Sequence, residues 1–158
     1  MDIAARMIQV HVYRMIDGLP EYLILKRSPD EDIYPNLWQV ITGTVEAGER
    51  AYESAFREIA EETSLAAEKI IILPMIASFY SQRSDCIHQV PVFALEVPPD
   101  APVALSDEHS TFLWGSFETA ISMLPLPSHK QGTELLRQII VEDTLGEFKQ
   151  IIEGPGSD

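Results

Sequence analysis

Cysteine is nearly absent from this chain, in which Cys86 is the single one among 158 residues. A disulfide within the chain and a zinc cluster of several thiolates are therefore excluded. No motif surrounds Cys86, so we expect an ordinary side chain rather than a nucleophile. The sequence also lacks an apolar run of the roughly 18 residues that a membrane span needs, and Met1–Arg14 does not have the unbroken apolar core of a signal peptide. These absences predict a cytoplasmic protein, in a reducing compartment, without a membrane partner.

Basic residues are also scarce. Eleven Lys and Arg stand against 25 Asp and Glu, which gives a formal net charge of −14. Sequence-independent binding of nucleic acid depends on Lys and Arg that neutralise phosphates, so a nucleic-acid partner is not expected. The acidic excess has two compatible interpretations: it keeps the protein soluble, or some of its carboxylates are gathered to hold a cation.

The length fits one domain with a packed core, since 46% of the 158 residues are hydrophobic. We expect this domain over residues 1–153 and a disordered tail over 154–158, which reads GPGSD.

Alternation and turn signals predict a series of strands around one central helix, with two helices at the end. An Asp-Gly pair within Ile16–Glu21 predicts a turn, and Ser28–Pro35 and Pro98–Pro102 are expected to be loops. The expected strands are Met7–Tyr13, Tyr22–Lys26, Leu37–Thr42, Ile70–Ser81, Ile87–Val97 and Thr111–Trp114. The expected helices are Ala51–Thr63, Ser116–Leu124 and Ser128–Val141. This order predicts an α+β fold, with a mixed sheet between helices on both faces.

The central helix carries three glutamates on one face. Glu58, Glu61 and Glu62 are spaced i, i+3 and i+4, so their side chains are neighbours and repel one another. A solvated charged surface is one interpretation of such a face. The other is a site for a hard divalent cation such as Mg²⁺, which prefers oxygen ligands and takes substrate phosphates as further ligands.

The spacing around these glutamates favours the second interpretation. The segment Gly43–Leu65 reads GTVEAGERAYESAFREIAEETSL and resembles the 23-residue signature of the Nudix hydrolase family. Eight of nine signature positions match, and Ser64 stands where the family has Gly. The nine positions are Gly43, Glu49, Arg57, Glu58, Ile59, Glu61, Glu62, Ser64 and Leu65. A Gly there closes a helix in the left-handed conformation, so Ser64 should cost about 1 kcal/mol or shift the helix end.

The resemblance implies a Nudix fold and a role for each matched residue. The metal ligands would be Glu58, Glu61, Glu62 and the carbonyl oxygen of Gly43, with Mg²⁺ as the cofactor and Mn²⁺ as an alternative. Arg57 and Glu49 would form an internal ion pair that orients the helix. Glu58 and Glu61 are candidates for the catalytic base that takes a proton from water, and Arg57 supports the chemistry.

Some Nudix branches place a further glutamate on a later loop, and Glu108 is the candidate here. It would complete the metal site or act as the base, against the alternative of an ordinary acidic turn. Glu96 and Asp107 are weaker rivals, and we expect the neighbouring His109 to be structural or exposed.

Two residues before the signature are candidates for binding the substrate. Arg27 ends a strand at a place where several Nudix enzymes reach the phosphates, although a surface charge is the alternative. Trp38 would stack on a base, unless it packs in the core. A weaker set after the signature comprises Tyr80, Gln82 and Arg83.

The segment Leu37–Gly48, with Glu108, His109 and Trp114, looks most like the branch that hydrolyses dihydroneopterin triphosphate or dATP. That branch implies a small triphosphate partner, cleaved to a monophosphate and pyrophosphate, and many family members are homodimers. The alternatives are a hydrolase of a nucleoside diphosphate linked to another group, such as ADP-ribose, and a nucleotide-sensing module without catalysis. An isoprenoid diphosphate isomerase shares the fold, but it would need a supporting motif around Cys86.

Overall fold

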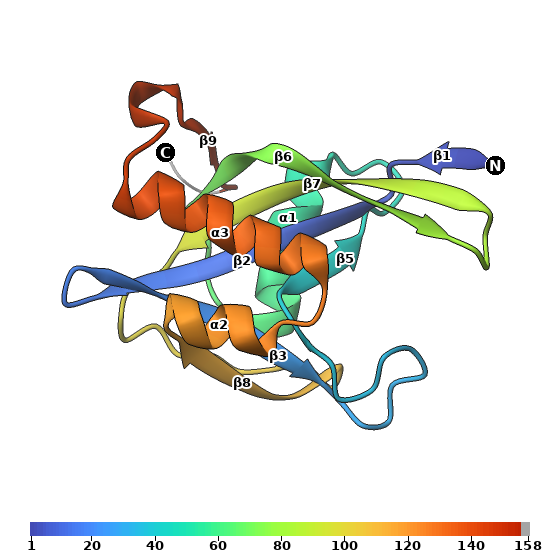
Figure 1. The fold of residues 1–158 in the computed structure, drawn as a ribbon, viewed down its shortest axis with the longest axis horizontal. Coiled ribbons are helices and arrows are strands. Elements are labelled where there is room, and N and C mark those ends of the chain that lie inside the picture. Colours follow the sequence, from blue (N-terminus) through green and yellow to red (C-terminus); the bar gives the residue numbers. More distant parts are fainter. Residues whose placement is uncertain (156–158) are drawn as a thin grey trace.

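The computed structural model describes residues 1–155 as one mixed sheet with helices on both of its faces (Figure 1). The strands of the described residues are β1 (Asp2–Ala4), β2 (Met7–Ile16), β3 (Leu19–Arg27), β4 (Trp38–Gln39), β5 (Ile41–Thr44), β6 (Lys69–Ser81), β7 (Cys86–Glu96), β8 (His109–Gly115) and β9 (Gln150–Glu153). The helices are α1 (Ala51–Thr63), α2 (Phe117–Met123), α3 (Pro127–Val141) and a 3₁₀ turn at Gly146–Phe148. No helix among these residues is long and apolar enough to cross a membrane.

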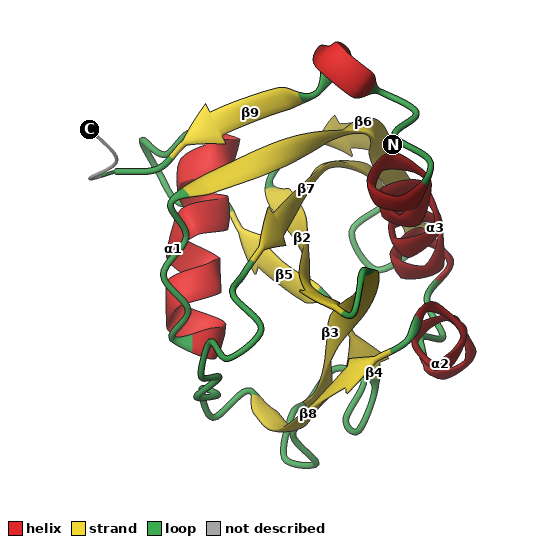
Figure 2. Ribbon diagram, turned by 90° about the vertical axis from the view of Figure 1, so that its left-hand side faces the viewer, coloured by secondary structure: helices red, strands yellow, loops and turns green. Residues whose placement is uncertain are grey.

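Helix α1 lies on one face of the sheet, and α2 and α3 lie on the other (Figure 2). The main path of the sheet is β4-β3-β2-β7-β6-β9, in which β2 and β7 are parallel and the other neighbours are antiparallel. The expected α+β arrangement, a mixed sheet between helices, is therefore confirmed.

The sheet forks where β2 and β3 separate, and each strand then pairs with a different neighbour. Strand β2 pairs with β3 only over Tyr13–Ile16, and over Met7–Val10 its partner on that edge is β5. Strand β3 correspondingly takes β4 as its partner at Leu25 and Lys26. The single strand expected over Leu37–Thr42 is thus wrong, because each half of this segment follows a different branch of the fork and Val40 joins them.

The turn between β2 and β3 is tighter than the sequence indicated. Only Asp17 and Gly18 lie between the strands, and both have positive φ, 49° and 80°. These angles are those of a type I′ turn, which matches the twist of two paired strands and explains the Asp-Gly pair.

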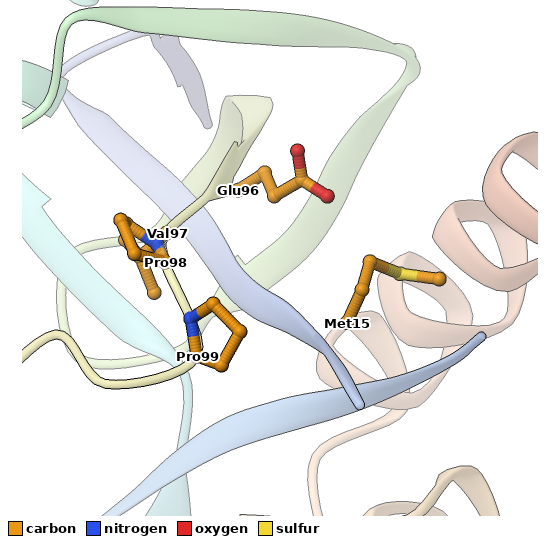
Figure 3. A pocket seen from close by; sticks show the side chains of 5 residues that line it. All are labelled: Met15, Glu96, Val97, Pro98 and Pro99. Atoms are coloured by element: carbon orange, nitrogen blue, oxygen red, sulfur yellow. The ribbon is translucent and has the colours of Figure 1, made fainter. Parts of the chain in front are cut away.

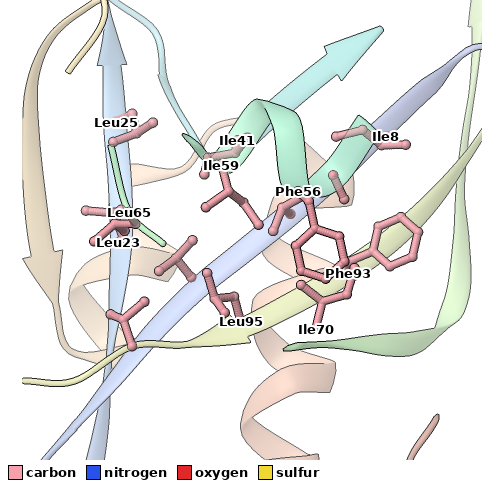
Figure 4. Packing of buried hydrophobic residues seen from close by; sticks show 14 residues of the cluster. Ile8, Leu23, Leu25, Ile41, Phe56, Ile59, Leu65, Ile70, Phe93 and Leu95 are labelled. Carbon is pink, nitrogen blue, oxygen red and sulfur yellow. The ribbon is translucent and has the colours of Figure 1, made fainter. Parts of the chain in front are cut away.

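Two apolar clusters lie on the two faces of the sheet, because side chains alternate along each strand. On β2, Ile8, Val10 and Val12 belong to the cluster beneath α1. Figure 4 shows Ile59 and Phe56 of α1 within the same cluster. This burial fixes one face of α1 against the sheet, so its glutamates are carried on a rigid support.

Helix α1 ends where the sequence predicted. Ser64 adopts the left-handed conformation with φ of 60°, and its amide donates to the carbonyl of Ala60 at 3.0 Å. Its hydroxyl donates to the carbonyl of Ala104 at 3.1 Å, which secures the unfavourable conformation. The departure from the signature therefore leaves the helix end in place.

Strands β1 and β9 were not predicted from the sequence; they are short strands at the margins of the sheet. Strand β9 pairs with β6, and the amide of the next residue, Gly154, donates to the carbonyl of Glu68 at 2.6 Å. Gly154 is buried, and residues 156–158 lie outside the described part, so the disordered tail expected over 154–158 stays a prediction.

A polar group is buried between β2 and α3. His11 is 2% exposed, and its Nδ1 lies 3.5 Å from the hydroxyl of Thr133. Gly132 permits this approach, since a Cβ there would lie 2.2 Å from Nε2 of His11. Burial, together with the neighbouring His129, lowers the pKa of His11 to about 3, and burial lowers that of His129 to about 4.

These two histidines should make the protein sensitive to acid. Both have a folded pKa below the unfolded value of 6.5, so the unfolded chain binds more protons and stability falls as the pH drops below about 6.5. Between pH 7.5 and pH 5 we expect each to remove about 2 kcal/mol from the free energy of unfolding. Urea unfolding at both pH values measures the loss. In His129→Gln the loss should shrink by about half, and a wild-type stability that does not change would contradict the account.

Candidate active site

An ion pair fastens the loop before α1 to the helix. Nε of Arg57 donates to Glu49 Oε1 at 2.6 Å, and its Nη2 donates to Glu49 Oε2 at 3.0 Å. Glu49 also accepts from the hydroxyl of Ser54 and from the amide of Glu46 at 3.0 Å. These hydrogen bonds, led by that from Arg57, lower the pKa of Glu49 to about 2, so the clamp stays ionised at neutral pH.

The rest of the Arg57 guanidinium organises the glutamate face. Its Nη2 donates to the carbonyl of Thr44 at 2.8 Å, and Nη1 donates to Glu58 Oε1 at 2.9 Å and to Glu61 Oε2 at 3.2 Å. One side chain thus contacts strand β5, the loop carboxylate and two glutamates of α1. The ion pair that the sequence predicted is present, and it positions the glutamates.

Arg57→Lys should preserve the charge but lose the planar fork that contacts Glu49 at two points. Because such supporting contacts orient metal ligands, we expect kcat/KM for the best substrate to fall by about 10- to 100-fold. Arg50→Lys is the control, since Arg50 is exposed in the loop just before α1. Equal kcat/KM in the two variants would contradict the role given to Arg57.

Glu58 lies against Gly43 of β5. Its side chain is largely buried, and a Cβ at position 43 would lie 2.3 Å from Glu58 Cδ. Burial raises the pKa of Glu58 above its usual value, although Arg57 opposes the shift. The glycine therefore gives this carboxylate the room to lie directly against the strand.

Glu62 is held by a different set of partners. It is 4% exposed, and its Oε2 accepts from the Ser106 hydroxyl and from His109 Nδ1, both at 2.9 Å. These hydrogen bonds outweigh burial and lower the pKa of Glu62. Nε2 of His109 lies 2.8 Å from Gln39 Nε2, so the buried imidazole connects Glu62 to β4. His109 is structural, in agreement with the first of the two roles expected for it.

The donor chemistry of this face fits a hard divalent cation. Glu58, Glu61 and Glu62 bring only carboxylate oxygens, and the backbone of Gly43 adds a carbonyl beside Glu58. Among residues 1–155, no three acidic, His or Cys side chains already converge on one point. Arg57 and His109 occupy oxygens of the three carboxylates, so a bound cation would take up the oxygens that remain and would relieve their mutual repulsion.

A cavity of about 780 Å³ adjoins the glutamate face. One set of lining residues is charged and lies beside Gly43; it comprises Glu46, Glu58, Arg27 and Glu108, and we call it the charged end. The remaining lining residues come mostly from β2, β5, β6, β7 and the start of α3, and we call this mostly uncharged set the neutral end. The residues there include Met7, Gln9, Thr42, Ala77, Val90, Leu126 and His129. One end is thus charged and the other is neutral, which suits an elongated molecule with a phosphate chain and an uncharged head group.

Glu108 lies at the charged end of the cavity, as its candidate role requires. Partial burial and the nearby Glu62 carboxylate raise its pKa. A carboxylate with a raised pKa is a better proton acceptor than an ordinary one. Glu61 and Glu108 are both exposed, but Glu61 is bonded to Arg57 and does not line the cavity. Asp107 does not line the cavity either, and its backbone carbonyl accepts from the Ser28 hydroxyl.

The substrate-binding candidates separate into two groups. Arg27 and Tyr80 line the cavity, although Arg27 also donates to the carbonyl of Ile33 at 2.9 Å. Trp38 does not line it and packs against the cluster beneath α2 and α3. Side chains alternate along a strand, so the adjacent Gln39 takes the cavity position and the expected stacking by Trp38 is not supported. Gln82 and Arg83 lie outside the cavity lining.

Glu96 does not line the cavity beside the glutamate face. It lines a separate depression of about 300 Å³ together with Met15 and the Val97–Pro99 turn (Figure 3). None of the residues of the signature lines this depression. The rival role of Glu96 as a base in the active site is therefore not supported by its position.

Sequence reasoning missed the polar residues that come from other elements. Gln9, Gln39, Ser106 and His129 contribute to the cavity or hold a glutamate, and all four lie outside the signature in sequence. One signal was available for Gln9, which is a polar residue between the apolar residues Ile8 and Val10 in the first part of β2.

Comparison with known proteins agrees with this geometry. The NUDIX domain model matches residues 5–139. The octanoyltransferase of Myxococcus xanthus is 36% identical over 110 residues, which cover 65% of this chain and 28% of that protein. This chain therefore spans less than a third of that relative's length.

A second relative is similar in length. The dihydroneopterin triphosphate diphosphatase of Escherichia coli K12 is 40% identical over 124 residues, covering 71% of this chain and 79% of the relative. The solved structure of the E. coli dihydroneopterin triphosphate pyrophosphohydrolase superposes with a TM-score of 0.70 over 86% of this chain and 94% of that chain, at 24% identity. At this identity the superposition shows the fold alone.

The candidate site thus combines a forked mixed sheet, a glutamate-bearing helix fastened by an Arg–Glu pair and an adjoining cavity. The chain belongs to the NUDIX domain family, whose model matches most of its length.

Proposed function

We propose that this Nudix hydrolase cleaves the diphosphate linkage of a small triphosphate, with Mg²⁺ as its cofactor and a monophosphate and pyrophosphate as products. The observation that carries the proposal is the position of Glu58 and Gly43 at the charged end of the cavity, with the Arg57 clamp behind them. The name of the E. coli relative supports a triphosphate of a nucleoside or of dihydroneopterin as the substrate class.

The residues assigned to the cation are Glu58, Glu61 and Glu62, with the Gly43 carbonyl. When bound there, the cation would neutralise the phosphates and lower the pKa of a water molecule. The water oxygen forms a bond to phosphorus, and the bond between that phosphorus and the bridging oxygen breaks. Glu108 is the base to which we assign the proton of the water, because its pKa is raised and it lines the same end of the cavity.

The remaining residues at this end position the reactants. Arg27 faces the phosphate chain from the end of β3, and Arg57 keeps the glutamates in register on α1. Such positioning is the main protein contribution in phosphoryl transfer, where little covalent work falls to side chains.

A product analysis tests the proposal. GTP, ATP, dihydroneopterin triphosphate, ADP-ribose and a dinucleoside tetraphosphate are each incubated with the protein and Mg²⁺, and the products are followed by ³¹P NMR. The proposal expects a triphosphate to give pyrophosphate and a monophosphate. Cleavage of ADP-ribose or the dinucleotide alone would overturn the substrate class but keep the site. Release of single orthophosphates from triphosphates would overturn the proposed bond.

A further inference from the structure

The neutral end of the cavity contains a glutamine whose orientation is fixed by its neighbours. Gln9 lies on β2 and is 2% exposed. Its Nε2 lies 3.1 Å from the carbonyl oxygen of Ser128 and 2.8 Å from Nε2 of His11. A carbonyl oxygen only accepts, so the amino end of the Gln9 amide faces Ser128.

The contact with His11 agrees with this orientation. The hydroxyl of Thr133 donates to the carbonyl of His129 at 2.9 Å, so its oxygen accepts from His11 Nδ1 at 3.5 Å. In the neutral imidazole the other nitrogen, Nε2, is then a bare acceptor for the second N–H of Gln9. Thr133 and His11 are therefore positioning residues that fix the side-chain amide of Gln9 in one orientation.

As a consequence, the side-chain oxygen of Gln9 is a hydrogen-bond acceptor that is not in use. Both N–H groups of Gln9 are bonded, while its Oε1 has no hydrogen-bond partner among residues 1–155. Gln9 lines the cavity, and its Oε1 is not among the fully buried unpartnered atoms of the described residues, so a ligand in the cavity can reach it.

His129 supplies a hydrogen-bond donor in the same cavity as this acceptor. The amide of Val40 donates to His129 Nδ1 at 3.4 Å, which places the imidazole proton on Nε2. That N–H has no partner among the described residues, and His129 lines the same end of the cavity. The surrounding wall is apolar and includes Met7, Ala77, Val90 and Leu126.

We infer that Gln9 determines specificity by accepting a hydrogen bond from an N–H group of an uncharged nitrogen heterocycle, which is the head group of the substrate. The inference rests on the proposed function, since it assigns the phosphate chain to the Glu58 end. His129 would donate to a ring nitrogen or carbonyl beside that N–H, as the edges of purines and pterins provide. A polyphosphate without a head group would leave both groups unbonded.

Gln9→Met tests the inference, because methionine has a similar volume and no acceptor. We expect KM for GTP, ATP or dihydroneopterin triphosphate, whichever is best cleaved, to rise about 10- to 100-fold with little change in kcat. The inhibition constant of tripolyphosphate, which has no ring, should stay unchanged. Gln138→Met on the exposed side of α3 is the matched control and should behave as wild type. Unchanged KM in a folded Gln9→Met protein, or an equal loss of tripolyphosphate binding, would overturn the inference.

A measurement on the wild-type protein covers the case in which Gln9→Met does not fold. Dissociation constants are compared between GTP and 1-methyl-GTP, and between ATP and N6,N6-dimethyl-ATP. Methylation removes the N–H groups, so the parent of the better-bound pair should bind at least tenfold more tightly. Equal binding within both pairs would overturn the inference. These constants need no turnover, so a failure of the proposed hydrolysis would be seen separately.

Discussion

Glu62→Gln should lose turnover while the protein remains folded. The substitution removes the negative charge of a carboxylate that we assign to the cation, and such residues contribute about 10²- to 10⁴-fold to rate. The amide oxygen of Gln still accepts from Ser106 and His109, so the hydrogen bonds that hold position 62 are preserved in kind. We expect kcat to fall by about 10³-fold and the free energy of unfolding to change by only about 1 kcal/mol.

The control for this experiment is Glu134→Gln, which makes the same chemical change on the exposed side of α3. Steady-state kinetics and urea unfolding are measured for both variants. Normal kcat in a folded Glu62→Gln protein would remove Glu62 from the catalytic site. Loss of folding would instead show that its buried contacts, rather than a bound cation, explain the residue.

Gly43→Ala is the second large effect that we expect. The new methyl group would lie 2.3 Å from Cγ and Cδ of Glu58 and 2.5 Å from its Oε1. Glu58 must therefore move, and displacement of a reacting group by about 1 Å costs on the order of 10²-fold in rate. We expect kcat/KM to fall by about that factor, with a loss of about 1 to 3 kcal/mol in the free energy of unfolding from overpacking.

Gly115→Ala is the comparable change outside the site. A Cβ at Gly115 would meet the side chain of Thr119 at 3.3 Å, which a small rotation relieves. Its kcat/KM should remain close to that of wild type. A Gly43→Ala enzyme as active as Gly115→Ala would show that Glu58 does not need its place against β5.

The chemistry of the site was predictable because it is encoded locally. Arg57, Glu58, Glu61 and Glu62 lie on one helix, and helical geometry alone brings them to one face. The clamp from Glu49 comes from the adjoining loop, eight residues away in sequence. The spacing of these residues was therefore enough to predict both the family and which face of the helix carries the glutamates.

The neutral end of the cavity was not predictable in this way. Gln9 and His129 are 120 positions apart, and they come together only because Gly132 allows α3 to approach β2. The fork of the sheet also depends on pairing between distant strands, so the division of Leu37–Thr42 into two strands had no local signal. For Trp38 the sequence left both stacking on a base and core packing open; the tryptophan packs against the core cluster, and its neighbour Gln39 lines the cavity.

The most direct test of the account is the dependence of hydrolysis on the cation. Release of pyrophosphate from the best triphosphate is measured in excess EDTA and again after Mg²⁺ is added beyond the chelator, with wild type and Glu62→Gln side by side. The account predicts no turnover in EDTA, full recovery of the wild-type rate with Mg²⁺, and no recovery in Glu62→Gln. Undiminished hydrolysis by the wild-type protein in EDTA would contradict it.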